Sequence, residues 1–197
     1  MHAPTRLLLL TCLLSSCSTW EPLIEPGSFE GWHARPGGAW EWQDDVLVGT
    51  SERSEARHGL LVSDDSFTDF EARFEFRVVR GCSGFYFRVK EVEQSFGVKG
   101  FQAEVDPTNE TGGLYETAGR AWVVRPDPDL MLGLYEAGAW TRMSVRAEGG
   151  DVEVRVNGVV TSALTDDPGR REGHFALQLH GGQDLHVEYR GLELRKL

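Results

Sequence analysis

The sequence predicts an all-β fold, an antiparallel sandwich or barrel, on three observations. Apolar and polar residues alternate along most segments after residue 20, which is the period of a strand with one packed and one solvated face. Glycine-rich turns separate these segments. Neither the period of an amphipathic helix nor an alternation of strands with helices is found, so a parallel α/β fold is not expected.

The N-terminal segment is predicted to direct export. A short basic start precedes an apolar run at 7–14, which is too short to span a bilayer and has the proportions of a secretory signal. The stretch Leu14-Ser-Ser-Cys17 then resembles the bacterial lipobox, in which the cysteine becomes the lipidated first residue after cleavage. A plain signal peptide or a disordered tail is the alternative.

This resemblance implies a domain organisation and a location. Residues 1–16 would be a lipoprotein signal peptide, 17–27 a tether lipidated at Cys17, and 28–197 a single β-sandwich domain. Ser18 rather than Asp after the cysteine implies delivery to the outer membrane. The protein is therefore expected in a bacterial cell envelope, at the outer membrane or in the periplasm, with the membrane as one partner.

The clearest strand is Phe70–Val78. Its apolar residues occupy every second position and its charged residues the positions between, as in a long antiparallel strand with one packed side. Further strands are expected at Trp40–Val48, Gly59–Val62, Gly84–Val89, Gly100–Val105, Trp140–Ala147, Val152–Val156, Val159–Ala163, His174–Leu179 and Leu185–Leu194.

Turn residues mark two hairpins and one long excursion. Glu148-Gly-Gly-Asp151 and Asn157-Gly158 each join two predicted strands, and Asn-Gly is a strong hairpin signal. The least regular stretch is 106–138, and a loop-rich excursion of that length in a compact domain is usually functional or disordered. Its aromatic and aliphatic residues, among them Tyr115 and Trp122, argue against disorder.

Charge and cysteine content exclude several classes of protein. The formal net charge is −11, and no basic stripe interleaved with aromatic residues is present, so nucleic-acid binding is not expected. Once Cys12 leaves with the signal and Cys17 carries lipid, Cys82 is the remaining thiol. Neither a disulfide framework nor a CxxC metal site can form within the chain, and the hydrophobic core must hold the fold.

The stretch GFQAEVD at residues 100–106 places polar side chains on alternate positions. Gln102, Glu104 and Asp106 would share one face of a strand. If the strand at 84–89 pairs beside them, Tyr86 and Arg88 could join the same face. Such a patch would hold two carboxyl groups, an amide, a phenol and a guanidinium, and paired carboxylates are the usual equipment for acid and base chemistry.

A solvated sheet face is the alternative interpretation of this row, since polar side chains commonly cover one side of an antiparallel sheet. The neighbouring loop favours a site. Residues 111–120 combine glycines with Tyr115, Glu116 and Arg120, as binding loops carried by rigid sheets often do.

Motifs spread over the chain resemble those of the 3-keto-disaccharide hydrolase family, a former domain of unknown function with a concanavalin A-like jelly-roll fold. The matching stretches, in order, are Phe29–Trp32, Trp42–Leu47, Phe67–Arg77, Cys82–Arg88, Gly100–Asp106, Thr111–Tyr115, Gly138–Val145, Val156–Gly158 and Gly173–His180. The most extended of these reads FTDFEARFEFR, against the family pattern Y-x-D-F-E-x-x-x-E-F-R.

This resemblance implies a secreted domain that acts on carbohydrate and cleaves a glycosidic bond in a sugar oxidised at C3. A ketone at C3 acidifies the proton on C2, so a base can remove it and the group on C1 can leave; water then adds back. The base would be Glu104 or Asp106, and Arg88 would stabilise the developing enolate. His180 would be an acid or a metal ligand, and a trio of Glu, Asp and His could hold a divalent metal as a Lewis acid. A surface or satisfied sheet histidine is the other interpretation of His180.

The expected contacts to the sugar come from the same face and from the loop. The residues expected to bind substrate are Tyr86, Gln102, Tyr115, Arg120, Trp122 and Gln178.

Two departures from the family pattern leave other functions open. Cys82 stands where many members have Asn, and Gln102 and Glu104 stand where many have Glu and Gln. A lectin-like lipoprotein without catalysis is the nearest alternative, with Tyr115 and Trp122 as sugar platforms. An endoglucanase of the same fold would need a third carboxylate at position 109, which is Asn. An envelope lipoprotein with a purely structural role is the third alternative.

Overall fold

The computed structural model describes residues 19–94 and 96–197. The signal peptide and the lipid site at Cys17 lie outside these residues, so both stay predictions. Within the described residues, no helix has the length and apolar character needed to cross a bilayer.

The described chain forms two β-sheets and one short helix. The eight-stranded sheet contains β1 (Glu21–Pro22), β3 (Ala39–Gln43), β4 (Val46–Ser51), β6 (Phe70–Arg80), β11 (Thr141–Glu148), β12 (Asp151–Val156), β13 (Val159–Leu164) and β15 (Leu185–Lys196). The seven-stranded sheet contains β2 (Trp32–Arg35), β5 (Gly59–Ser63), β7 (Ser83–Glu91), β8 (Val98–Val105), β9 (Leu114–Thr117), β10 (Ala121–Val124) and β14 (His174–Leu179). The helix α1 (Pro128–Met131) lies in the connection between β10 and β11.

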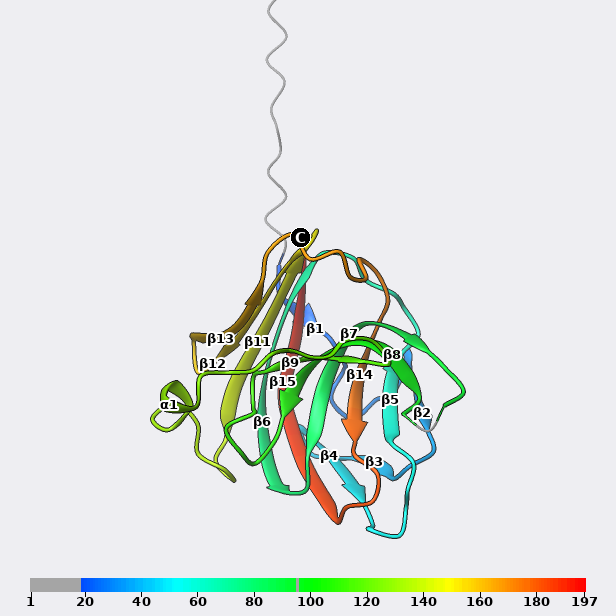
Figure 1. The fold of residues 1–197 in the computed structure, drawn as a ribbon. Coiled ribbons are helices and arrows are strands. Elements are labelled where there is room, and N and C mark those ends of the chain that lie inside the picture. Colours follow the sequence, from blue (N-terminus) through cyan, green and yellow to red (C-terminus); the bar gives the residue numbers. More distant parts are fainter. Residues whose placement is uncertain (1–18, 95) are drawn as a thin grey trace, which may run out of the picture.

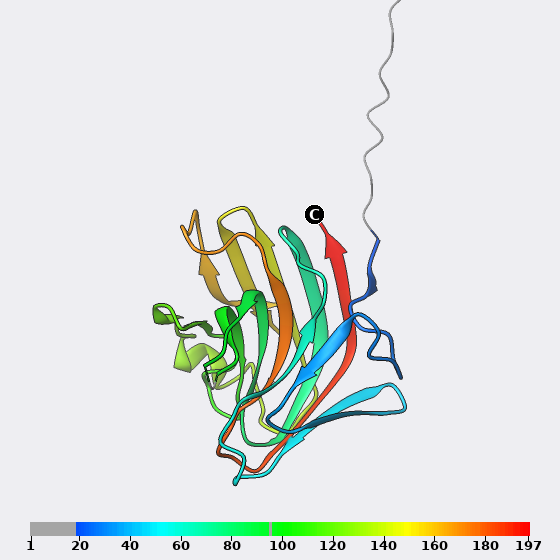
Figure 2. The ribbon, with the colours of Figure 1, turned by 90° about the vertical axis from the view of Figure 1, so that its right-hand side faces the viewer.

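Both sheets are antiparallel, and the predicted sandwich is confirmed (Figures 1 and 2). The larger sheet runs in the order β13-β12-β11-β6-β15-β4-β3, with β1 added beside β15, and the smaller in the order β10-β9-β8-β7-β14-β5-β2. One apolar cluster fills the space between them, with Phe74 and Val145 from the larger sheet and Phe85 and Leu177 from the smaller. This shared core is what holds the two layers together.

The strand at β6 follows the predicted alternation. All five apolar side chains between Phe70 and Val78 are buried in the core, and the charged residues between them lie on the outer face. Both predicted hairpins also form. Glu148 pairs with Asp151, and Val156 pairs with Val159 across Asn157 and Gly158, which both have positive φ as a two-residue turn requires.

The segment predicted as a single strand at 40–48 is a hairpin instead. Gln43 pairs with Val46 across a turn at which Asp44 has a φ of 55°. Asp tolerates this left-handed conformation better than most residues. The pair Asp44-Asp45 therefore indicates a turn, which the alternation of apolar and polar residues does not reveal. The strands β2, β9 and β10 were not predicted either; the last two form a hairpin within the 106–138 excursion.

Part of the segment assigned to the tether belongs to the sandwich. Glu21 and Pro22 pair with the end of β15, and Leu23 and Ile24 are buried in the core. The domain therefore begins before residue 28. The start of β1 and the end of β15 lie at the same end of the molecule (Figure 2).

Candidate functional site

A cleft of about 490 Å³ lies on the outer face of the seven-stranded sheet. Eight of the ten side chains predicted for catalysis or substrate binding line it: Tyr86, Gln102, Glu104, Asp106, Tyr115, Trp122, Gln178 and His180. They come from β7, β8, β9, β10 and β14 and from the residues that follow β8 and β14. Arg88 and Arg120 are absent from its lining.

The floor of this cleft differs from an ordinary solvated sheet face. Tyr86 is 1% exposed, Gln178 3% and Gln102 4%, although all three carry polar groups on the side of the sheet that faces away from the core. Buried polar groups must be hydrogen-bonded, and an arranged network of them is typical of a binding site.

Pairing register places the two glutamines against each other. Gln102 lies opposite Tyr86 on β7, and Gly84, the next residue of β7 on the same face, lies opposite Glu104. A Cβ atom on Gly84 would come within 2.2 Å of Nε2 of Gln102. The glycine therefore leaves the space through which the Gln102 side chain crosses β7 toward Gln178 on β14.

Hydrogen bonds join the floor into one network. Nε2 of Gln102 donates to Oε2 of Glu104 at 3.1 Å and to Oε1 of Gln178 at 3.2 Å. Nε2 of Gln178 donates to the hydroxyl of Tyr86 and faces Nδ1 of His58, each at 3.0 Å. The Tyr86 hydroxyl lies 3.1 Å from that of Thr117. Each amide is fixed by partners on both sides, so the network determines that Glu104 receives an N–H donor.

Glu104 stands at one end of the network with a strongly perturbed acidity. Burial raises the pKa of its carboxyl group to about 8, with further contributions from the negative charges of Asp106 and Glu110; the Gln102 hydrogen bond opposes them. A carboxyl group with a pKa near neutrality exchanges protons readily at physiological pH, which suits a general base or acid.

Asp106 has a different setting from Glu104. Its Oδ1 accepts hydrogen bonds from the backbone N–H of Thr108, at 2.7 Å, and from the Thr108 hydroxyl. The backbone N–H of Asp106 in turn donates to Thr111. Asp106 thus caps the turn that follows β8, and of the two carboxylates predicted as the base, Glu104 is the one not committed to holding a turn.

Two histidines face each other beside the acidic end of the cleft. The rings of His58 and His180 meet edge to face, with centroids 4.3 Å apart. Burial, together with the charge of His180, lowers the pKa of His58 to about 4. A neutral His58 matches its place in the network, since Nδ1 must accept the hydrogen bond from Gln178. Nδ1 of His180 lies 2.9 Å from the carbonyl of Gly181.

Cys82 contributes a neutral thiol to this end of the cleft. Burial raises its pKa to about 11, and Nε2 of Gln183 lies 3.2 Å from its sulfur. The protonated thiol is a weak donor where many family members carry an amide.

Tyr115 and Trp122 form an aromatic side wall. Their rings meet edge to face at a centroid distance of 5.5 Å, on the hairpin formed by β9 and β10. The guanidinium of Arg125 lies 4.1 Å from the Trp122 ring centroid and orients it further. Both rings line the cleft, as an aromatic platform for sugar requires.

The placement of Arg88 in the site was wrong. β7 bulges between Phe87 and Lys90, and Arg88 there has a φ of 50°, so it leaves the alternation that predicted its face. The side chain is fully buried, and its guanidinium donates to the carbonyls of Thr68, Gly149 and Arg170 and to Asp69. Arg88 thus connects the two sheets at one end of the sandwich.

The placement of Arg120 was also wrong. Its guanidinium pairs with both carboxylate oxygens of Asp167, at 2.6 and 3.0 Å, and with Glu116. These ion pairs anchor the turn between β9 and β10 to the segment before β14. Its role is to position the hairpin that bears Tyr115 and Trp122.

The sequence did not single out His58, Phe96 or Thr117 as site residues, although all three line the cleft. Thr117 could have been found, since it alternates with Tyr115 on one short strand. His58 precedes β5, and Phe96 lies in the β7–β8 connection; no local pattern relates either residue to β8.

Two other observations bound the chemistry. Among residues 19–94 and 96–197, no group of three or more His, Cys, Asp or Glu side chains is arranged to hold a metal ion.

A second hollow, of about 540 Å³, lies on the outer face of the eight-stranded sheet. Its arginines Arg73, Arg142 and Arg190 are already paired with Glu75 and Glu193, which leaves little charge there for a ligand.

The comparison with protein families identifies the chain. Residues 19–195 match the model of the 3-keto-alpha-glucoside-1,2-lyase-like domain. The chain belongs to this family. The predicted resemblance is confirmed, and membership indicates a function related to carbohydrate. No curated protein sequence matches the chain.

Solved structures agree on the fold. A crystal structure named "Putative glycosyl hydrolase" from Parabacteroides distasonis ATCC 8503 is 17% identical, with a TM-score of 0.66 over 91% of this chain and 100% of that one. The carbohydrate-binding module CBM66 from Bacillus subtilis is 17% identical, with a TM-score of 0.62 over 84% and 96% of the two chains. The VIP36 exoplasmic/lumenal domain in its Ca2+/Man3GlcNAc-bound form is 13% identical, with a TM-score of 0.55 over 89% and 88%. The predicted concanavalin A-like jelly roll is thereby confirmed.

Proposed function

We propose that the cleft binds a 3-keto glycoside and cleaves its glycosidic bond by elimination followed by hydration, with Glu104 as the base. The observation that carries this proposal is the combination of a carboxyl group of pKa about 8 with an aromatic wall in one cleft. Membership of a 1,2-lyase-like family supports elimination between C1 and C2.

The steps balance without an external oxidant or reductant. The Glu104 carboxylate takes the proton from C2, and the electrons of that C–H bond form an enolate on the C3 oxygen. The enolate collapses to restore the C3 ketone and to form a C1–C2 double bond while the C1–oxygen bond breaks. The leaving oxygen takes a proton from the enzyme. Water then adds its hydroxyl to C1 and gives its other proton to the enzyme group that protonated the leaving oxygen, and C2 regains a proton from Glu104, so both groups return to their starting states.

His180 is the proton donor in this proposal. Its Nδ1 lies 2.9 Å from the carbonyl of Gly181 and 3.2 Å from Nε2 of Gln183, so Nε2 is the ring nitrogen that would supply the proton to the leaving oxygen. Arg88 does not stabilise the enolate, because its donors are occupied on the far side of the bulge. Both N–H groups of the Gln102 amide are already donated, to Glu104 and Gln178, so the thiol of Cys82 is the donor that this end of the cleft offers.

A carbohydrate-binding module without catalysis is the second candidate function. The Tyr115–Trp122 pair favours it, because an aromatic wall binds sugar whether or not a bond is cleaved. Attachment to the cell envelope through Cys17 belongs to either proposal and is supported by the lipobox-like Leu14–Cys17 stretch.

The soluble domain, residues 18–197, is expected to release a chromogenic leaving group from a 3-keto-glucoside and not from the unoxidised glucoside. The ketone is what makes the C2 proton removable, so the difference tests the reaction class directly. Parallel assays with EDTA or added divalent metal test whether a metal takes part. Saturable binding of both glucosides without release from either would instead establish the binding module.

The value of kcat/KM is expected to rise with pH and to level off above about pH 8, because the base must be ionised and its pKa is raised to about 8. Asp106→Asn should move this limb to lower pH, since it removes a negative charge that raises the pKa of Glu104. The asparagine keeps an oxygen to accept the Thr108 hydrogen bonds, so the turn should persist. If kcat/KM of this variant rises over the same pH range as that of the wild type, the assignment of Glu104 as the base is contradicted.

A further inference from the structure

Phe96 lines the cleft from the connection that leads into β8, whereas Glu104 lies near the other end of that strand. This residue and Gly97 are the last two of the connection between β7 and β8, and Phe96 lines the cleft while half-buried. Glu104 lies near the C-terminal end of β8 and Phe96 just before its start. The four-residue step along β8 from Glu104 back to Gly100 alone spans about 13 Å. Phe96 and Glu104 therefore belong to opposite ends of β8, although both line the cleft.

This end of the sheet face is apolar. Leu60, Val62, Val89, Val98 and Ala176 form a buried cluster there with the ring of Tyr86. The connection folds over this cluster at Gly97. A Cβ atom on Gly97 would come within 2.6 Å of a methyl carbon of Leu60, and the residue has a φ of +74°. Glycine is thus required for both the close approach and the backbone conformation, and it fixes where Phe96 sits.

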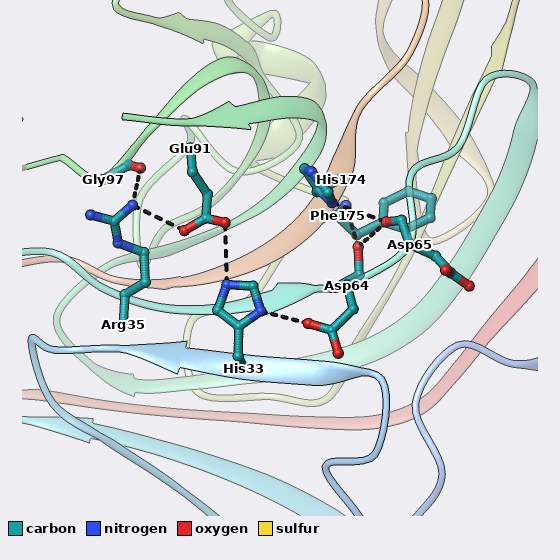
Figure 3. Close-up of polar contacts among 9 residues, drawn as sticks. His33, Arg35, Asp64, Asp65, Glu91, Gly97, His174 and Phe175 are labelled. Carbon is teal, nitrogen blue, oxygen red and sulfur yellow. Dashed lines mark hydrogen bonds and ion pairs between the residues drawn. The ribbon is translucent and has the colours of Figure 1, made fainter. Parts of the chain in front are cut away.

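A chain of polar side chains that includes His33 and Arg35 of the edge strand β2 holds the same connection in place (Figure 3). Arg35 donates from Nη1 to the carbonyl of Gly97 and to Oε2 of Glu91, each at 3.0 Å. Oε1 of Glu91 lies 3.2 Å from Nε2 of His33, whose Nδ1 lies 2.6 Å from Oδ1 of Asp64. The contacts run from the β5–β6 connection through β2 to the end of β7.

These contacts position a segment next to the cleft in addition to stabilising the fold. Exposed ion pairs contribute little free energy, typically about 0–1 kcal/mol each. Arg35, however, is only 23% exposed and holds the carbonyl of the residue that follows Phe96. The polar chain fixes a backbone position next to the cleft, where a shift would move an aromatic ring relative to the floor.

We propose that Phe96 is a specificity-determining residue that stacks against a second sugar ring, and that Arg35, oriented by Glu91 and His33, positions it. This inference rests on the proposed binding of a glycoside in the cleft. In this inference one sugar ring lies at Glu104, and Phe96 is the residue on which the apolar C–H face of the second ring lies. The aromatic ring provides dispersion contact and has no polar atom of its own, so it selects for a ring rather than for a hydroxyl pattern.

The test measures the activity of the soluble domain, residues 18–197, on two substrates: a 3-keto disaccharide and the corresponding methyl 3-keto-glucoside. Phe96→Ala is expected to raise KM for the disaccharide about tenfold, which is about 1.4 kcal/mol of binding free energy. The value of kcat for the disaccharide should stay within about twofold of the wild-type value. The same is expected of kcat and KM for the methyl glycoside. The unchanged methyl glycoside shows that the variant is folded.

Arg35→Met should reproduce the rise in KM for the disaccharide, and Arg35→Lys should recover part of it, because one ammonium can still reach Glu91 or Gly97. Leu132→Ala, at the exposed residue that caps the C-terminal end of α1, is the matched control and should change neither constant.

The outcomes separate this inference from the proposed function. If the wild-type protein neither cleaves nor binds either compound, the proposed function is refuted. If it turns over both compounds and Phe96→Ala affects them equally, or neither, the second-ring contact is refuted while the proposed function stands. If Phe96→Ala is selective and Arg35→Met is not, the positioning role of Arg35 is refuted.

Discussion

Glu104→Gln is expected to lower kcat for release from a 3-keto-glucoside by about 10²–10⁴-fold, the usual contribution of a general base. Glutamine matches glutamate in shape and can still accept the hydrogen bond from Gln102, so the floor of the cleft should keep its arrangement. The dissociation constant for the substrate, measured by calorimetry with the inactive variant, should stay within a few-fold of the wild-type KM.

The same substitution is expected to stabilise the fold at neutral pH. The pKa of Glu104 is about 8 when folded and about 4.5 when unfolded, so the folded state binds more protons between these values. The contribution of this carboxyl group to stability is therefore fully present below about pH 4.5 and is lost as pH rises toward 8. Glutamine removes this loss, which should raise the free energy of unfolding at pH 8 by about 1–3 kcal/mol relative to wild type.

Urea titration at pH 5 and pH 8 tests the second effect independently of the substrate. The gain should be larger at the higher pH. A variant that keeps full activity would remove Glu104 from catalysis, and one that loses sugar binding together with activity would favour a binding role for this side chain. A gain in stability that does not depend on pH would contradict the raised pKa.

Arg88→Met is expected to lower the free energy of unfolding by about 3–5 kcal/mol, the cost of removing one partner of a buried charged network. The guanidinium donates to Asp69 and to backbone carbonyls of three separate segments, among them Thr68 and Gly149. Methionine fills much of the same volume but cannot donate, so all the hydrogen bonds of this fully buried guanidinium are lost at once. At about 2–4 °C per kcal/mol for a domain of this size, Tm should fall by about 6–20 °C.

Arg53→Met is the matched control for this loss. Arg53 pairs with Asp184 at 3.5 Å, and its side chain is 77% exposed, so its removal should cost about 0–1 kcal/mol. At a temperature where Arg88→Met is still folded, its kcat/KM should be close to that of the wild type. A stable Arg88→Met protein without activity would instead return Arg88 to the site, as its position in the motif Cys82–Arg88 suggested.

The strands were predictable because their signal is local. In Phe70–Val78 every second side chain is apolar, and any sheet that buries one face must place these residues together, whatever its neighbours are. The row Gln102–Glu104–Asp106 was predictable for the same reason. The family motifs indicated that this polar row, among the several in the sequence, belongs to the site. Two-residue turns such as Asn157-Gly158 also carry their conformation in their own sequence.

The residues that were misplaced or missed depend on contacts between distant segments. Arg88 follows the alternation of its strand up to the bulge, and that bulge forms only when β7 and β8 pair with one extra residue on one side. His58 comes to the site because β5 pairs with β14. Phe96 comes to it because Gly97 packs on Leu60 and Arg35 holds the carbonyl of that glycine.

The sequence by itself therefore determined the fold class, most of the strands, the family and the polar row that forms the floor of the cleft. Period and turn chemistry are properties of neighbouring residues, and they survive without knowledge of the rest of the chain. Only the tertiary structure decided which carboxylate is free to act, that Arg88 is a structural residue, and that histidine and phenylalanine side chains complete the cleft. Burial, pKa and the direction of a hydrogen bond arise from segments brought together across the sheet, and no single strand encodes them.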